Sequence, residues 1–405
     1  MLADDYHVVL YEAEPRLGGH ARTIVAGKRG DQPVDTGFIV FNYANYPHLA
    51  TLFDELDVPV ALSDMSFGAS LKGGRLEYGL KDLRATLAQK RNIANPRFLG
   101  MVRDIFRFNA RAREAAKDPT LTIGQFLEVI GTGAWFRDYY LLPLSGAIWS
   151  TPKHGILDFP AHAMIRFFEN HALLGYSGQH QWYTVEGGSI EYVRRLGDAL
   201  RRRGVDIRLG APVDAVRRTA EGVEVKAPGA EWEGFDEVVF ATHSDDALGM
   251  LSDASDAERA SLAAIRYQSN EAVLHCDARM MPNRRACWSS WNYTEASDKT
   301  TDRIDLTYWM NCLQPIPKDD PLFVTLNSTR QIRDDLIYDQ TTFRHPVYDL
   351  AALAAQDTLR ASNGQNRTWF CGAWMKNGFH EDGLGSAVDV VEALRAADAM
   401  GIAAE

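Results

Sequence analysis

HVVLYEAEPRLGGHART, at residues 7–23, is the stretch of this sequence on which the fold depends. Its apolar strand ends in Glu12 and leads into a turn that carries Gly18, Gly19 and Arg22. A carboxylate at the end of a parallel strand is where α/β folds hold the ribose of an adenine dinucleotide. An arginine beside a glycine turn can pair with a pyrophosphate. The stretch therefore predicts an α/β, doubly wound nucleotide-binding fold.

One part of that nucleotide-binding unit is not found in the sequence. Such a strand normally follows another strand, a G-x-G-x-x-G turn and a helix, together about 30 residues long. Only MLADDY stands before it, and no other G-x-G-x-x-G occurs in the chain. We therefore expect the first strand and the phosphate loop to be absent, because of a start codon assigned too far downstream or a genuine truncation.

Composition excludes several classes of protein. The 405 residues suit two domains, and a net charge of −11 argues against a nucleic-acid partner. No run of about 18 apolar residues predicts a membrane span, and no secretion signal opens the chain. The cysteines are scattered without a C-x-x-C pair, which favours reduced thiols over a metal site: Cys276, Cys287, Cys312 and Cys371. We expect a cytoplasmic protein that binds no metal.

Nucleotide-type segments stand at the start, in the middle and at the end of the chain, with other blocks between them. This order predicts two interleaved domains. We expect the nucleotide-binding domain to comprise residues 1–60, 181–245 and 365–405, and the substrate domain to comprise residues 61–180 and 246–364.

Local patterns predict several elements. Residues 46–57 have helical spacing, and Thr122 to Gln125 resembles a capping box before a helix. Five apolar residues are expected to line one face of another helix: Phe98, Val102, Ile105, Phe106 and Phe108.

The strongest single signal is RTWFCGAWMKNGFHEDGLGSAVDVVEAL, at residues 367–394. Strand 368–371 runs into Gly372, and after a loop Gly383 and Ser386 open a helix. Glycines allow a ligand to approach the backbone, and free N–H groups at a helix N-terminus suit an electron-rich group. Farther upstream, Val213 in GAPVDAV could hold an adenine edge through its backbone.

These segments, in this order, resemble the FAD-dependent amine oxidase superfamily, which includes phytoene desaturases and protoporphyrinogen oxidases. The resemblance covers nearly the whole chain and is carried by LYEAEPRLGGHART, LPLSGAIWSTP and CGAWMKNGFHEDGLGSA. It is closest to the bacterial predicted NAD/FAD-binding oxidoreductases, which are often encoded beside cyclopropane fatty acid synthases.

The resemblance implies a glutathione-reductase-type FAD domain interleaved with an α+β substrate domain. Glu12 would hold the adenosine ribose, and Val213 would contact adenine. Gly18, Gly19 and Arg22 would line the pyrophosphate and the ribityl chain. The flavin end would be surrounded by Gly372, Gly383, Leu384 and Ser386.

The resemblance also bears on the substrate. Amine-oxidising members place a lysine near flavin N5, whereas RRACWSSWNY at residues 284–293 offers Arg284 and Arg285 but no lysine. This favours hydride abstraction from an apolar substrate, such as a lipid acyl chain or a polyene, over amine oxidation that releases peroxide. The alternative outside catalysis is a flavin-deficient accessory protein of lipid modification.

No catalytic base can be assigned from sequence. His171, Trp182 and His380 are candidates to face the substrate, although packed core residues are the commoner outcome for such positions. Four tryptophans could form an apolar pocket or simply be core: Trp149, Trp288, Trp291 and Trp309. For His380-Glu381-Asp382 we expect a loop-stabilising or flavin-adjacent role rather than a metal site.

A lipid substrate would be compatible with peripheral contact to a membrane or to a lipid-modifying enzyme. No single stretch, however, is basic and apolar enough to predict membrane binding.

Overall fold

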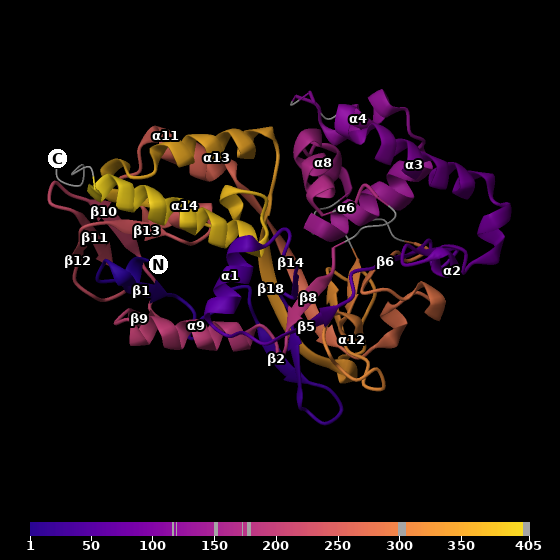
Figure 1. Cartoon of the computed structure of the whole chain (residues 1–405), viewed down its shortest axis with the longest axis horizontal. Helices are drawn as coiled ribbons and strands as arrows, with labels where there is room; N and C mark the ends of the chain where they lie inside the picture. The colour runs from indigo at the N-terminus through magenta and orange to yellow at the C-terminus, as the bar shows by residue number, and fades with distance from the viewer. Residues whose placement is uncertain are drawn as a thin grey trace.

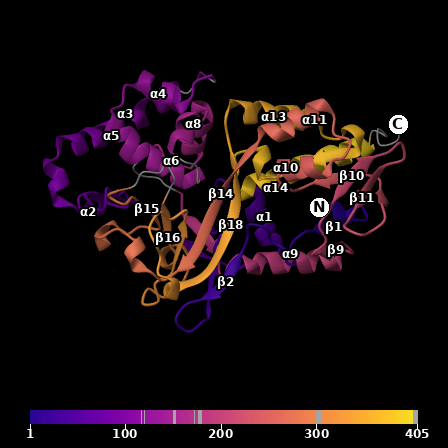
Figure 2. The same ribbon diagram turned by 180° about the vertical axis from the view of Figure 1, so that it is seen from behind.

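The computed structural model describes residues 1–115, 117–118, 120–149, 153–171, 173–175, 180–298 and 305–399. The chain forms an α/β molecule with two ends (Figure 1). One end holds the nucleotide-type segments and both termini, and the other holds a helical block above a mixed sheet. The long strands β14 (Arg266–His275) and β18 (Ile337–Val347) lie between the two ends in both views (Figure 2).

The nucleotide-type end is built on two parallel strand pairs. β1 (Val9–Glu12) pairs with β9 (Asp206–Leu209), and β13 (Val238–Phe240) pairs with β19 (Thr368–Phe370). Among the described residues, no strand joins the two pairs. A small antiparallel sheet adjoins them, with the strands β10 (Ala215–Arg218), β11 (Val223–Lys226) and β12 (Glu233–Phe235).

Helices flank these strands on two sides, as the sequence predicts for a doubly wound fold (Figures 1 and 2). On one side lies α9 (Ile190–Arg202). On the other lie α10 (Ser244–Met250), α11 (Asp256–Ala264), α13 (Leu350–Ser362) and α14 (His380–Ala399). α1 (Pro47–Glu55) contacts α14 near the centre of the molecule.

The other end contains a seven-stranded sheet in the order β18-β14-β17-β16-β15-β6-β7, which is antiparallel except between β15 and β6. Its remaining strands are β17 (Phe323–Leu326), β16 (Leu306–Trp309), β15 (Trp291–Thr294), β6 (Phe67–Leu71) and β7 (Leu76–Gly79). Smaller pieces are β4 (Val40–Phe41), β8 (Trp182–Val185), β5 (Val60–Ser63), the hairpin of β2 (Thr23–Ala26) and β3 (Gln32–Asp35), and α12 (Met310–Leu313).

The helical block consists of α2 (Leu83–Thr86), α3 (Pro96–Ala115), α4 (Ile123–Ile130), α5 (Ala134–Phe136), α6 (Leu142–Trp149), α7 (Lys153–Leu157) and α8 (Ala161–Asn170). The largest hydrophobic core joins this block to the seven-stranded sheet. It is filled by buried aromatic rings, among them Phe108, Phe126, Phe136 and Phe168. Within the described ranges, we find no helix that combines the length and apolar character needed to span a bilayer.

Several sequence expectations are confirmed. The expected helix at 46–57 is α1. Thr122 and Gln125 form a complete capping box, and α4 ends at left-handed Gly131.

One expected helix face is partly wrong. Phe98, Ile105 and Phe108 are buried along α3, but Phe106 is 54% exposed. Position 106 is rotated away from that stripe, because it follows Ile105 by a single residue and so lies about 100° farther around the helix.

The C-terminal helix begins earlier than expected, at His380 rather than at the glycines. The Asp382 carboxylate accepts the N–H of Phe379 (2.9 Å), so the backbone N–H just before the helix has a hydrogen-bond partner. The neighbouring Glu381 carboxylate accepts the N–H groups of His48 and Leu49 at the start of α1 (2.9 Å each). These two carboxylates therefore hold helix starts in place.

The proposed division into two domains, with the boundaries given above, stays a prediction. Within it, these residues lie outside the described part of the chain: 116, 119, 150–152, 172, 176–179, 299–304 and 400–405.

A buried carboxylate connects the two ends of the molecule. Asp35, at the end of β3, accepts hydrogen bonds from the Thr23 hydroxyl (2.6 Å) and from the Ser189 backbone N–H and hydroxyl (2.8 Å each). Gln314 donates its amide to the other carboxylate oxygen (3.1 Å). Gly188 makes room for this arrangement, because a Cβ there would lie 2.6 Å from Thr23 Cγ2.

We predict that Asp35→Ala lowers the free energy of unfolding by about 3 kcal/mol, because it leaves several buried donors without an acceptor. Urea denaturation measures the change. Asp31→Ala is the control, since Asp31 lies exposed on the same hairpin beside Arg29 and should change stability by less than about 0.5 kcal/mol. Equal effects of the two substitutions would contradict the role of Asp35.

Candidate functional site

A large cavity lies among the described residues where the two ends of the molecule meet. Its volume is about 1110 Å³, above the usual range for small-molecule sites of about 300–1,000 Å³. On one side it is lined from the β1 turn, β18 and α14, and on the other from α3, α6 and α8. The cavity is therefore large enough for a bulky ligand.

The N-terminal turn of α14 faces this cavity through Gly383 and Leu384. Ser386 is buried behind them, where its hydroxyl accepts the N–H of Gly372 (2.8 Å) and contacts the Gly383 carbonyl (2.8 Å). Gly372 has φ +147°, and a Cβ there would lie 2.6 Å from Trp374 Nε1. Gly372 and Ser386 thus fix the start of the helix, while Gly383 and Leu384 form the cavity wall.

The β1 turn reaches the same cavity at His20. Gly37 packs so closely on it that a Cβ at Gly37 would lie 1.9 Å from the His20 carbonyl oxygen. The His20 ring meets Phe343 edge-on at 4.9 Å. Burial lowers the pKa of His20 to about 3, with a smaller contribution from His345, so its imidazole is neutral.

The remaining expected nucleotide residues lie away from the cavity lining. Glu12 ends β1, and its carboxylate accepts the N–H of Glu14 (2.9 Å). Gly18, with φ +113°, packs against α9, and Gly19, with φ +53°, is exposed. Val213 is half-buried in the link between β9 and β10.

Arg22 is already paired within the protein. Its guanidinium forms two hydrogen bonds to Asp339 of β18 (2.5 and 3.1 Å), and both side chains are about one-fifth exposed. This bidentate pair joins the β1 turn to the seven-stranded sheet. The expected contact of Arg22 with a pyrophosphate stays a prediction, and it would require the ion pair to rearrange.

The three substrate-side candidates, His171, Trp182 and His380, all line the cavity. His380 bonds the Tyr192 hydroxyl through Nε2 (2.7 Å) and stacks on Phe38 at 4.1 Å. Burial lowers its pKa to about 4, so the ring is neutral near pH 7.

His171 has a defined tautomer. Its Nδ1 lies 3.0 Å from the Phe167 carbonyl, which can only accept, so Nδ1 carries the proton and Nε2 is left as an acceptor. Burial lowers the pKa of His171 to about 4. The substrate side of the cavity therefore holds a neutral imidazole whose Nε2 has no hydrogen-bond donor among the described residues.

Aromatic rings that line the substrate side stack on one another. Phe167 is parallel to Phe379 at 4.7 Å and to His171 at 3.8 Å. Trp149 and Trp291 also line the cavity. The other two candidate tryptophans, Trp288 and Trp309, do not line the cavity. They pack with Phe323 in a separate hydrophobic cluster.

Two arginines occupy the segment in which amine-oxidising relatives would be expected to carry a lysine, and neither lines the cavity. Arg284 pairs with buried Glu77 (2.6 Å), and Arg285 lies over the Trp288 ring at 3.7 Å. Among the described residues, Lys81 is the one lysine in the cavity lining, and its ammonium pairs with Asp64 (2.6 Å). Lys81 is exposed, which places this pair at the opening rather than in the interior.

His345 is a lining residue that sequence reasoning missed. The side-chain amide of Asn327 donates to Asn270 Oδ1 (2.6 Å), which fixes the orientation of the Asn270 side chain. Asn270 Nδ2 therefore donates to His345 Nδ1 (3.1 Å). The proton of neutral His345 is then on Nε2. These residues are far apart in the sequence, and no motif connects them.

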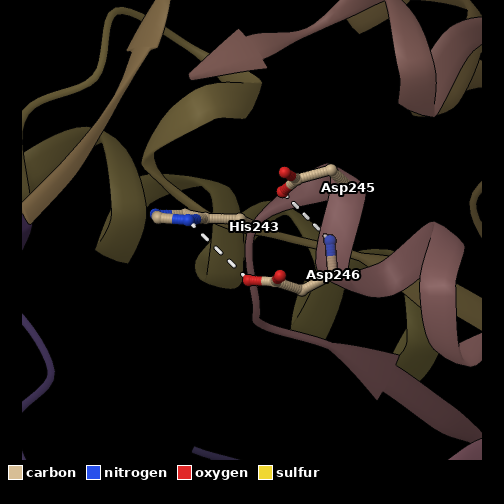
Figure 3. A group of neighbouring side chains, drawn as sticks. All are labelled: His243, Asp245 and Asp246. Atoms are coloured by element: carbon tan, nitrogen blue, oxygen red, sulfur yellow. Dashed lines mark hydrogen bonds and ion pairs between the residues drawn. The ribbon is translucent and has the colours of Figure 1, made fainter. Parts of the chain in front are cut away.

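One side-chain cluster has the composition of a metal site: His243, Asp245 and Asp246 (Figure 3). Arg344, however, pairs with both aspartates, at 3.1 Å in the case of Asp246. The guanidinium occupies both carboxylates and offsets part of their charge, so the cluster gives no reason to assign a metal.

Comparison with known proteins places this geometry in a family. The family described as flavin containing amine oxidoreductase matches residues 2–379. No curated protein sequence matches the chain.

Solved structures share the fold at low sequence identity. A fatty acid isomerase from P. acnes that produces CLA is 13% identical, with a TM-score of 0.68, and covers 96% of this chain and 98% of its own. Cyclohexylamine oxidase from Brevibacterium oxydans is 14% identical, with a TM-score of 0.65, and covers 95% and 93%. Putrescine oxidase bound to putrescine is 15% identical, with a TM-score of 0.64, and covers 95% and 92%.

The α/β fold predicted from the sequence is thus confirmed. Because the family match spans most of the sequence, the chain belongs to the flavin-containing amine oxidoreductase family and is an FAD-dependent oxidoreductase.

Proposed function

We propose that this oxidoreductase removes a hydride from a carbon of an apolar substrate, such as a lipid acyl chain or a polyene. The observation that carries the proposal is the cavity lining, which is apolar and aromatic through the helical block. Its interior histidines are neutral, and its lysine and carboxylate pair at the opening. Of the two carboxylates among the described lining residues, Asp64 pairs with Lys81 and Asp82 caps α2, so neither is positioned in the apolar interior to bind a cationic amine.

The residues present fit a flavin. α14 directs its N-terminal end at the cavity, where the helix dipole favours negative charge. Gly37 and Gly383 both line the cavity without a side chain of their own. When bound there, FAD supplies a two-electron acceptor for a hydride.

The protein's own groups would bind and orient the substrate. The apolar walls from α3, α6 and α8 exclude water and align a chain along the cavity. Removing a hydride from one carbon and a proton from its neighbour leaves a double bond. His171 Nε2 is the acceptor available for that proton on the substrate side.

The comparisons support this choice in one respect. A protein with the same fold is, by its name, a fatty acid isomerase, so the fold is compatible with an acyl chain as substrate. Other proteins with the fold are amine oxidases by name, and the cavity of this chain is what favours the apolar substrate.

We predict that unsaturated fatty acids bleach the visible flavin absorption of the FAD-loaded protein without oxygen, whereas cyclohexylamine and putrescine do not. Stopped-flow absorbance measures the reduction. Photoreduction in a parallel sample checks that the flavin is competent. Reduction by amines together with no response to any lipid would overturn the proposal.

Filling the cavity should impair substrate binding. Val102 lines the cavity from α3, so Val102→Trp is expected to raise KM for the acyl substrate by about tenfold while the flavin spectrum is kept. Val129→Trp is the matched control, because Val129 is 62% exposed on α4. If the two variants behave alike, the chain does not bind where we place it.

The rate should be insensitive to pH near neutrality. His171 and His380 have pKa values lowered to about 4 by burial, so both stay neutral from about pH 7 to 9 and the flavin-reduction rate should stay flat there. The same lowered pKa values affect the free energy of unfolding. The stabilisation that comes from keeping these histidines neutral is complete above about pH 6.5 and is lost as the pH falls through about 4.

The flavin-reduction rate is measured by absorbance at each pH. Circular dichroism of the same samples shows whether the protein is still folded, which separates titration from unfolding. A rate that rises or falls tenfold between about pH 7 and 9 in a folded protein would contradict neutral histidines.

A further inference from the structure

The cavity opens through an exposed apolar surface. Leu83 of α2 is 79% exposed, Phe106 of α3 is 54% exposed and Leu80 is 38% exposed, and all three line the cavity. Leu87 and Leu99, in the same part of the chain, are also exposed. We call these five residues the mouth patch. Exposed apolar side chains around an opening are typical of a surface that meets another apolar phase.

The segment that carries the mouth patch is strongly basic. Residues 81–113 contain nine lysines and arginines and two aspartates, a formal charge of +7 in a chain whose total is −11. The rest of the chain therefore carries −18. Both aspartates of the segment have partners: Asp82 caps α2, and Asp104 pairs with Arg103 and Arg107.

Several of the basic side chains are exposed and unpaired. Within the part of the chain that the structure describes, Arg84, Lys90, Arg97 and Arg111 form no ion pair. They belong to the same segment as the mouth patch, while the remainder of the protein is acidic. This asymmetry would orient the molecule toward an anionic surface.

We propose that the mouth patch and the basic side chains around it dock on an anionic lipid bilayer, with the cavity opening toward the membrane. The charges would contact lipid headgroups, and Leu83 and Phe106 would enter the interface between headgroups and acyl chains. An acidic soluble protein would satisfy the charges, but it would not account for an apolar opening that leads into a deep apolar cavity. The docking needs only this surface and does not depend on the reaction proposed above.

Flotation with lipid vesicles tests the docking. The full chain, loaded with FAD, is mixed with phosphatidylglycerol vesicles or with phosphatidylcholine vesicles. We expect binding to the anionic vesicles at least tenfold stronger than to the neutral ones, and weaker binding as salt screens the charges. Equal binding to the two lipids, or no binding to either, would overturn the proposal.

Charge-neutralising variants locate the surface. Each basic side chain near an anionic membrane contributes about fivefold to partitioning, so Arg84→Gln/Lys90→Gln/Arg97→Gln should weaken vesicle binding by about 100-fold. The matched control is Arg194→Gln/Arg201→Gln/Arg202→Gln on α9, which removes the same charge from a helix at the opposite end (Figures 1 and 2). A control that weakens binding as much as the test variant would refute docking through the mouth.

A second pair of variants tests the apolar contact. Leu83→Glu should weaken vesicle binding by about tenfold or more, because a charge replaces a side chain that enters the interface. Val25→Glu is the control, since Val25 is 64% exposed on the β2–β3 hairpin. Thermal unfolding midpoints confirm that all variants fold.

Competition identifies the occupant. Soluble polyglutamate should not displace the protein from phosphatidylglycerol vesicles at a matched charge concentration. Complete displacement, with tight binding to the polymer itself, would assign the surface to an acidic protein and overturn the proposal.

Discussion

The carboxylate of Asp35 is the constraint on which the cavity depends. It joins the β2–β3 hairpin to the N-terminus of α9 and, through Gln314, to the end of α12. The residues that follow it, Thr36 to Phe38, line the cavity. Burial raises the pKa of Asp35 to about 6, so near pH 7 the charged form is held inside the protein. For this group alone, stability is complete below about pH 3.8 and decreases as the pH rises through about 6. The hydrogen-bond donors around the carboxylate offset part of that cost.

This junction also determines which groups in the cavity are charged. Walls contributed by both ends of the molecule keep His20, His171 and His380 enclosed, and enclosure favours the neutral imidazole. The charged pair of Lys81 and Asp64 lies at the opening, where water solvates it. The interior is thus suited to a ligand without charge, apart from the end that α14 faces.

Sequence reasoning was most successful where chemistry is local. The start of α4, the glycine turn before α9 and the strand that leads to Gly372 follow from backbone requirements that short motifs reveal. The cavity-lining role of His171, Trp182 and His380 was one of two readings, and the structure brings all three together. His345 was missed because its orientation depends on Asn270 and Asn327, distant in sequence. The partnership of Arg22 with Asp339 was missed for the same reason, since a motif gives the position of a guanidinium but not its nearest carboxylate.

The surface shows why totals conceal function. A net charge of −11 is a sum, and the same value arises whether charges are mixed or segregated. In this chain they are segregated, and the basic segment, residues 81–113, also contributes the exposed Leu83 and Phe106 to the cavity lining. Exposure decides what that coincidence means. The spacing of apolar residues in the sequence predicts that Phe106 is part of the core. If it were, α3 would be an ordinary amphipathic helix, with its apolar face buried and its basic residues in water. Because Phe106 and Leu83 instead face outward beside the opening, the same residues form a surface that is at once basic and apolar. An anionic bilayer offers both complements together, and it is also where an apolar substrate would be dissolved.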